Sequence, residues 1–281
     1  MSYLSNPARF DGAQRALTED ELRKYAPSVF AVTAHESRSD RFSVIPTIEV
    51  IRALSREGFE VVGAEQSRCR QPGRADFTKH MLRIRQLRSG LQVGDTVFEM
   101  KLKNANDGTC QYDLFSALFR IACLNSMVAM TSELSSVKVR HSGDVIGKVI
   151  EGTYQVIQDG QAALEAPDKW SRIQLQPEEQ SIFAEQAHML RFADNEGKVT
   201  TAIKPAQLLH ARRSEDDGND LWRTFNRVQE NVIRGGQTAW GTDANNHRRR
   251  FTARPIKGID QDVKLNRALF TLAAKMAELK A

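Results

Sequence analysis

Alternation between apolar and charged side chains is the feature of this sequence that most restricts its fold. Between positions 97 and 103, Phe, Met and Leu alternate with Glu, Lys and Lys, and residues 82 to 85 alternate Leu and Ile with two arginines. A two-residue period indicates a half-buried strand, and such strands usually form antiparallel sheets with one wet face. The predicted strands are Glu60–Arg70, His80–Leu87 and Val97–Lys103.

Helical signals flank these strands. Thr18 and Glu21 form a capping box, and Pro46 opens a helical pattern that ends at Gly58. The stretch Tyr112–Met130 is apolar on most sides, which predicts a helix on the dry face of the sheet. A short strand is expected at Ser136–His141, so the order is α-β-β-β-α-β.

The C-terminal half is expected to be mainly helical. The predicted helices are Asp144–Ala163, Pro177–Phe192, Asp220–Arg234 and Asp260–Lys280, and Trp240–Arg254 is expected to be a flexible loop. The predicted class is α+β: an antiparallel β-meander packed on helices, followed by a helical C-terminal region. The expected divisions are an N-terminal arm at 1–40, a core at 41–142 and the helical region at 143–281.

Positive charge is concentrated on the predicted strands. Nine Lys and Arg residues against three acidic residues give the segment 68–103 a charge of +6, whereas the whole chain carries +5. A sheet face lined with cations attracts a polyanion, because Lys and Arg displace condensed counterions from phosphates. The alternative is a solvated face that only keeps the protein soluble. The expected phosphate contacts are Arg68, Arg70, Arg83, Arg85, Lys101 and Lys103, with Arg120, Arg140, Arg248, Arg249 and Arg250 as secondary candidates.

A nuclease site is the first alternative. Glu99-x-Lys101, with Asp76 or Asp95 upstream, imitates the Asp…Glu-x-Lys pattern in which carboxylates hold Mg²⁺ and a lysine activates water. The triplet is short and common by chance. The six histidines and three cysteines have no metal-ligand spacing, and the phosphate-loop-like segment at 143–148 departs from the required pattern. We therefore predict no catalytic residue, metal or cofactor.

Composition and cysteine content indicate the cellular location of the protein. No stretch approaches 18 apolar residues, and residues 1–10 lack the apolar core of a secretory signal. Three cysteines are an odd number without paired spacing, which argues against a disulfide framework. A cytoplasmic protein without a membrane partner is expected.

The sequence resembles a known family, the phage- and plasmid-encoded proteins of domain of unknown function 932 (YfjQ and YafZ type). The resemblance runs from Arg41 to near the C-terminus. It is strongest in the pattern Asn104–Gly108 followed by Leu118–Val128, with small departures at Ala105 and Ser126. Other matching stretches are EGFEVVGAEQSRCR, FTKHMLRIR, DLWRTFNRVQENVIRGG and GIDQDVKLNRALFTLA. The resemblance implies a mobile-element protein and gives no mechanism.

The order α-β-β-β-α also looks like the core of single-strand annealing proteins. That likeness implies a ring or filament of subunits that holds single-stranded DNA in a basic groove. Aromatic residues near the basic strands are few, so the hypothesis is a grip on phosphates rather than base stacking. The expected function is single-stranded DNA binding and annealing in recombination of a phage or plasmid, as a homo-oligomer. The second alternative is a non-enzymatic mobile-element protein that binds a host defence factor.

Overall fold

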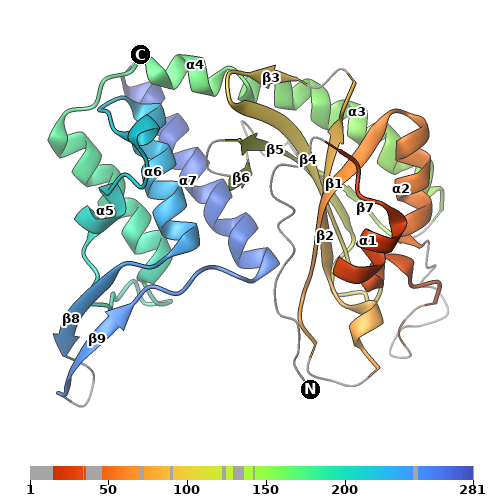
Figure 1. Ribbon diagram of the computed structural model, residues 1–281, viewed down its shortest axis with the longest axis horizontal. Helices are drawn as coiled ribbons and strands as arrows, with labels where there is room; N and C mark the ends of the chain where they lie inside the picture. The colour runs from red at the N-terminus through yellow and green to blue at the C-terminus, as the bar shows by residue number, and fades with distance from the viewer. Residues whose placement is uncertain are drawn as a thin grey trace. The chain divides into compact units, whose positions relative to one another are not determined.

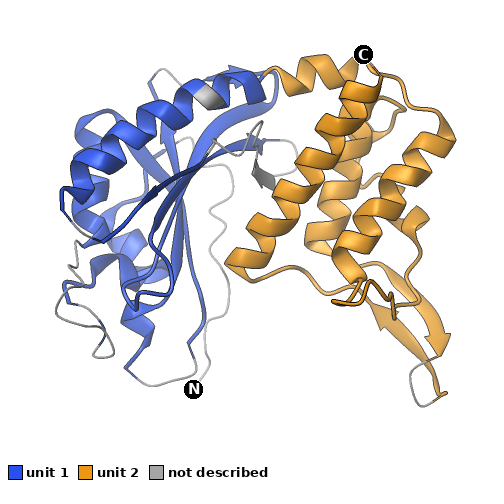
Figure 2. Cartoon of the chain, turned by 180° about the vertical axis from the view of Figure 1, so that it is seen from behind, with its two compact units in different colours: residues 1–164 blue, residues 165–281 orange. Residues whose placement is uncertain are grey.

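The structure is a computed structural model. It describes residues 15–33, 35, 46–69, 73–88, 91–121, 125–128, 136–141, 143–242 and 246–280. The chain divides into two compact units, residues 1–164 and 165–281 (Figure 2). Each unit has its own core and is described separately.

The first unit is built on one antiparallel sheet (Figure 1). Its strands run in the order β1-β2-β4-β5; β3 pairs with β4, while β6 and β7 pair with successive parts of the same edge of β5. The bounds are β1 Phe59–Gln66, β2 His80–Gln86, β3 Gln92–Val93, β4 Thr96–Asn104, β5 Tyr112–Arg120, β6 Asn125–Val128 and β7 Ser136–Val139. The strands predicted around 60, 80, 97 and 136 are confirmed; Arg70, the predicted end of the first, lies outside the described residues.

Helices cover one face of this sheet. In Figure 1 the long helix α3 (Val145–Ala163) lies across it, and α2 (Thr47–Arg56) packs beside α3 and β1. The apolar alternation of β4 is directed to this side, where Phe98 and Met100 lie near Ile157 of α3. Before α2 come α1 (Glu19–Tyr25) and the 3-10 helix η1 (Pro27–Phe30), and η2 (Ala75–Phe77) precedes β2. The capping box of Thr18 and Glu21 is present at α1.

The prediction of a helix over Tyr112–Met130 is wrong. Residues 112–120 form β5 and residues 125–128 form β6, while 122–124 and 129–130 lie outside the described residues. All nine residues of β5 are buried, because the strand is central in the sheet and covered on both faces. A short apolar run of that kind has no two-residue period and cannot be told from a buried helix by pattern. The helix on the dry face is α3 instead.

The second unit is a helical assembly around α6. Its rings pack closely: Trp170 of α4 lies 4.9 Å from Phe270 of α7 and 5.5 Å from Phe225 of α6 between ring centroids. Asp220 caps α6 by accepting from the backbone N–H of Arg223. The bounds are α4 Ala166–Ser171, α5 Pro177–Phe192, η3 Pro205–Leu209, η4 Ser214–Asp216, α6 Leu221–Arg234 and α7 Ile259–Leu279. The helices predicted at 144, 177, 220 and 260 are thus confirmed.

The segment predicted as a flexible loop is a β-hairpin. Strands β8 (Thr238–Thr242) and β9 (Arg248–Thr252) pair antiparallel, with Trp240 opposite Arg250. This hairpin is visible in Figure 1 as the blue pair of arrows. Its residues 243–245 lie outside the described part of the chain.

Within the described residues, no helix is both long enough and apolar enough to cross a membrane.

Candidate nucleic-acid interface

The strand register brings the central sheet cations to one face, as predicted. Arg83 lies opposite Lys101 across the β2–β4 pair, and Glu99 is two residues from Lys101 on the same side. Both oxygens of Glu99 accept hydrogen bonds from Arg83, at 2.8 Å from Nε and 2.7 Å from Nη2. Arg85 Nε donates to the same carboxylate at 2.5 Å. One carboxylate therefore serves two guanidinium groups.

Aromatic contacts complete this cluster, which we call the Glu99 cluster: Arg83, Arg85, Glu99, Lys101 and Phe119. The guanidinium carbons of Arg83 and Arg85 lie 4.1 and 4.5 Å from the centroid of the Phe119 ring. Glu99 is 0% exposed and Lys101 2%. The expectation of a wet basic face is therefore wrong for these residues.

The electrostatics of Glu99 follow from this packing. Burial alone opposes ionisation, but the charges and hydrogen bonds of Arg83 and Arg85 outweigh it and hold the pKa of Glu99 below its ordinary value. Glu99 therefore offsets part of the positive charge of the cluster, and the two guanidinium groups in turn offset the cost of burying its carboxylate.

The other predicted cations of the first unit are dispersed. Lys103 Nζ lies 3.5 Å from Asp113, and Arg120 Nε donates to Asp95 at 2.8 Å. Arg68 and Arg140 are exposed at the ends of β1 and β7, while Arg70 lies outside the described residues. The sheet thus brings together Arg83, Arg85 and Lys101 but does not line them up with the others on a solvent-facing surface.

The nuclease alternative gains no support from this geometry. Both oxygens of Glu99 already accept from guanidinium groups, so the carboxylate is not poised to hold Mg²⁺. Asp95, its possible companion, bonds Arg120 instead. Among the described residues, no group of three or more His, Cys, Asp or Glu side chains is placed to hold a metal ion.

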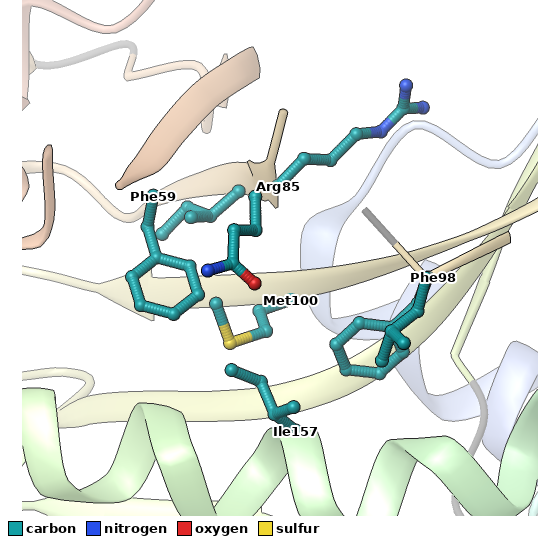
Figure 3. Close-up of a pocket in the computed structure, with 8 residues that line it drawn as sticks. Phe59, Arg85, Phe98, Met100 and Ile157 are labelled. Atoms are coloured by element: carbon teal, nitrogen blue, oxygen red, sulfur yellow. The ribbon is translucent and has the colours of Figure 1, made fainter. Parts of the chain in front are cut away.

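A small pocket lies on the α3 side of the sheet (Figure 3). Phe59, Phe98, Met100 and Ile157 line it, while the side chain of Arg85 extends away from it. Its volume of about 20 Å³ holds little more than a water molecule. The pocket is a packing gap and not a ligand site.

The phosphate-loop-like segment at 143–148 is a capped helix start. Asp144 accepts from the N–H of Gly147 at 2.9 Å, so a carboxylate already occupies the position that an anion would take.

The hairpin β8–β9 is the second basic element, and its cations are exposed. Arg248, Arg249 and Arg250 all face solvent, and no acidic residue occurs from Asn245 to Lys257. Alternation divides the hairpin into two faces. The outer face holds Trp240, Arg248 and Arg250 together with Thr238, Thr242 and Thr252.

The orientation of the hairpin follows from its other face. Gly241 lies so close to Ala202 that a side chain at position 241 would overlap it, and Phe251 packs beside Gly241. This inner face is anchored to the second unit, and Gln207 also donates to the Thr238 carbonyl at 2.9 Å. The outer face therefore projects to solvent: Trp240 is 64% exposed.

Trp240 is the residue that the sequence analysis missed. Its indole lies under the Arg248 guanidinium, 5.5 Å from carbon to ring centroid. Trp240 lies far along the chain from the basic sheet strands, in a segment that the sequence predicts to be a loop. A hairpin at this place could have been predicted from two short stretches, TAWGT and RRRFT, which are separated by a segment containing the turn-favouring pair Asn-Asn.

Comparisons with known proteins agree with the resemblance seen in the sequence. Residues 34–270 match the family model described as Domain of unknown function (DUF932). The UPF0380 protein YafZ of Escherichia coli (strain K12) is 43% identical over 259 residues, which cover 92% of this chain and 91% of that protein. The UPF0380 protein YfjQ of the same strain is 42% identical with the same coverage. No solved structure matches the chain, so the likeness to single-strand annealing proteins stays a prediction. Because the family model spans most of the chain and both relatives align along nearly all of it, this chain belongs to the DUF932 family.

Proposed function

We propose that the protein binds single-stranded DNA and promotes the annealing of complementary strands in recombination of a mobile element. The observation that carries the proposal is the exposed outer face of the β8–β9 hairpin. There Trp240 lies opposite Arg250 and beneath the guanidinium of Arg248, and the described strands of the hairpin contain no acidic residue. Exposed guanidinium groups on a two-stranded element supply the sequence-independent phosphate contacts that dominate nucleic-acid affinity.

The hairpin is supported by further basic residues next to it. Arg254 and Lys257 follow β9 and are exposed. Arg191 of α5 donates to the Arg254 carbonyl at 2.6 Å, which holds this segment against the second unit. The five cations from Arg248 to Lys257 form a continuous stretch of positive charge with no internal carboxylate.

The Glu99 cluster has a lesser place in the proposal. Glu99 cancels one of its three positive charges, and its side chains are largely buried, so it offers DNA less accessible positive charge than its three cations suggest. That Arg83, Arg85 and Lys101 touch phosphate stays a prediction. The homo-oligomeric state is likewise proposed because annealing two strands needs more than one binding surface.

A salt-titrated binding assay tests the proposal. Anisotropy of a labelled oligonucleotide is measured with the wild type, with Arg248→Ala/Arg250→Ala, and with the control Lys264→Ala/Lys275→Ala, which removes two cations from α7. The hairpin variant should bind more weakly, and its salt slope should fall by about 0.7 for each lost phosphate contact. The control should bind like the wild type.

Strand pairing is measured in parallel with two complementary oligonucleotides and a duplex-sensitive dye. The wild type should accelerate pairing and the hairpin variant should not. Equal binding by the hairpin and control variants would refute the assignment of the hairpin, and absence of any DNA binding by the wild type would refute the function.

A further inference from the structure

We propose that Trp240 stacks on an unpaired nucleobase, so that the hairpin binds the bases of single-stranded DNA as well as its phosphates. The inference rests on the proposed DNA binding and deepens it by naming the ligand at one residue. It replaces the expectation of a pure phosphate grip.

The exposure of Trp240 sets it apart from the other tryptophans. Trp170 and Trp222 are 5% and 6% exposed and pack against Phe225, whereas Trp240 is 64% exposed. The hairpin is held by its inner face, so burying the indole is not required for its packing. A large aromatic surface that the fold leaves in water is available to a ligand.

The neighbours of Trp240 decide which ligand fits. A protein-binding tryptophan is usually surrounded by other apolar groups that exclude water. The outer face offers instead Arg248, Arg250 and three threonines, which are donors to phosphate oxygens. An exposed aromatic ring beside one guanidinium group, with a second arginine opposite it on the neighbouring strand, matches the stacking platforms of proteins that bind single strands.

The spacing also fits one nucleotide. Arg248 and Arg250 are two residues apart on β9, roughly 7 Å along the strand, with Trp240 opposite Arg250. A base on the indole therefore has a guanidinium within reach of the phosphate on either side. Duplex DNA cannot use this site in the same way, because its bases already stack on one another.

Tryptophan fluorescence gives the direct test. Since Trp170 and Trp222 are buried, quenching by an added oligonucleotide reports chiefly Trp240. An oligo(dT) strand should quench the wild type saturably, and Trp240→Ala should lose this quenching. An abasic strand of the same length has the same phosphates and should bind without comparable quenching.

Affinities measured by anisotropy separate stacking from phosphate binding. Trp240→Ala should weaken binding of oligo(dT) about tenfold and binding of the abasic strand far less. Trp240→Phe should restore most of the difference, because a phenyl ring still stacks. Arg249→Ala, which alters the opposite side of the hairpin, should affect both strands alike.

The outcomes distinguish this inference from the function on which it rests. If Trp240→Ala weakens both strands equally while the wild type binds DNA, stacking is refuted and the phosphate-binding function stands. If the wild type binds neither strand, both are refuted. Unchanged circular dichroism of Trp240→Ala and Trp240→Phe confirms that the variants are folded.

Discussion

Replacing Glu99 by glutamine removes the charge that holds the Glu99 cluster together. The side chain keeps its size, but its amide nitrogen donates where the carboxylate accepted, and Arg83 and Arg85 lose their shared anion. Breaking a buried ion pair typically costs about 3–5 kcal/mol, because one charge is left without compensation. Arg83 keeps some contact with solvent, with 16% of its side chain exposed, so we expect the lower end, about 3 kcal/mol.

The effect is measured by urea unfolding followed by far-ultraviolet circular dichroism. A loss of about 3 kcal/mol with a slope near 2 kcal/mol/M lowers the midpoint by roughly 1.5 M. All three tryptophans lie in residues 165–281, so fluorescence follows the second unit separately. Faster amide exchange in β2 and β4 localises the damage to the first unit.

Two further variants make the result specific. Glu19→Gln breaks an exposed pair with Arg52 and should leave the midpoint unchanged. The triple variant Arg83→Met/Arg85→Met/Glu99→Leu replaces the two guanidinium groups and their shared carboxylate with apolar side chains, and it should be more stable than Glu99→Gln. A midpoint for Glu99→Gln within error of the wild type would refute the reasoning that Glu99 compensates a buried core cluster.

Two other predictions concern stability. Burial lowers the pKa of His80 to about 4, and its ring bonds Ser28 at 2.8 Å and Thr47 at 3.0 Å. The unfolded histidine, with its ordinary pKa near 6.5, binds the proton first. Stability should therefore fall as the pH drops from about 6.5 to 4, by up to roughly 1.4 kcal/mol per pH unit from this group. In His80→Gln the slope of unfolding free energy against pH should be shallower; an identical slope would contradict the assignment. Asp220→Ala should destabilise α6 by about 1 kcal/mol through loss of its N-terminal cap, whereas Asp220→Asn keeps the acceptor and should cost less. Thermal unfolding followed by tryptophan fluorescence compares the two, and equal losses would contradict the capping role.

The parts of the fold that could be predicted are those with a periodic or capped sequence. The two-residue period placed β2 and β4 and assigned Arg83, Glu99 and Lys101 to one face, which the register confirms. The capping box of Thr18 and Glu21 placed α1, whereas α6 is capped by Asp220 and begins one residue later than predicted. The period of β5 was absent because both of its faces are buried, and the strands of the hairpin are only five residues long.

The sequence predicted which cations lie on one face of the sheet, but not whether they are buried or which residues they contact. Alternation fixes which side chains share a face, but not what covers that face. The sequence offers Glu99 only as a metal ligand of the alternative nuclease site, whereas in the structure its carboxylate binds two of the predicted phosphate-binding arginines. The sequence alone does not show that Trp240 is near an arginine. Only the pairing of β8 with β9 places it opposite Arg250.

The two basic elements differ in where their charge acts, and this makes them separable by experiment. In the Glu99 cluster, Arg83 and Arg85 are largely buried and share one carboxylate that cancels half of their combined charge. Removing an arginine there should lower stability and change the salt dependence of DNA binding little. On the hairpin, Arg248 and Arg250 face solvent on strands whose described residues include no acid, so their removal should lower affinity and the salt slope while the unfolding midpoint stays constant. Glu99→Gln sharpens the distinction, because it raises the charge of the sheet face by one. If that face gripped DNA, the folded variant would bind more tightly; if the hairpin is the principal contact, its affinity stays that of the wild type.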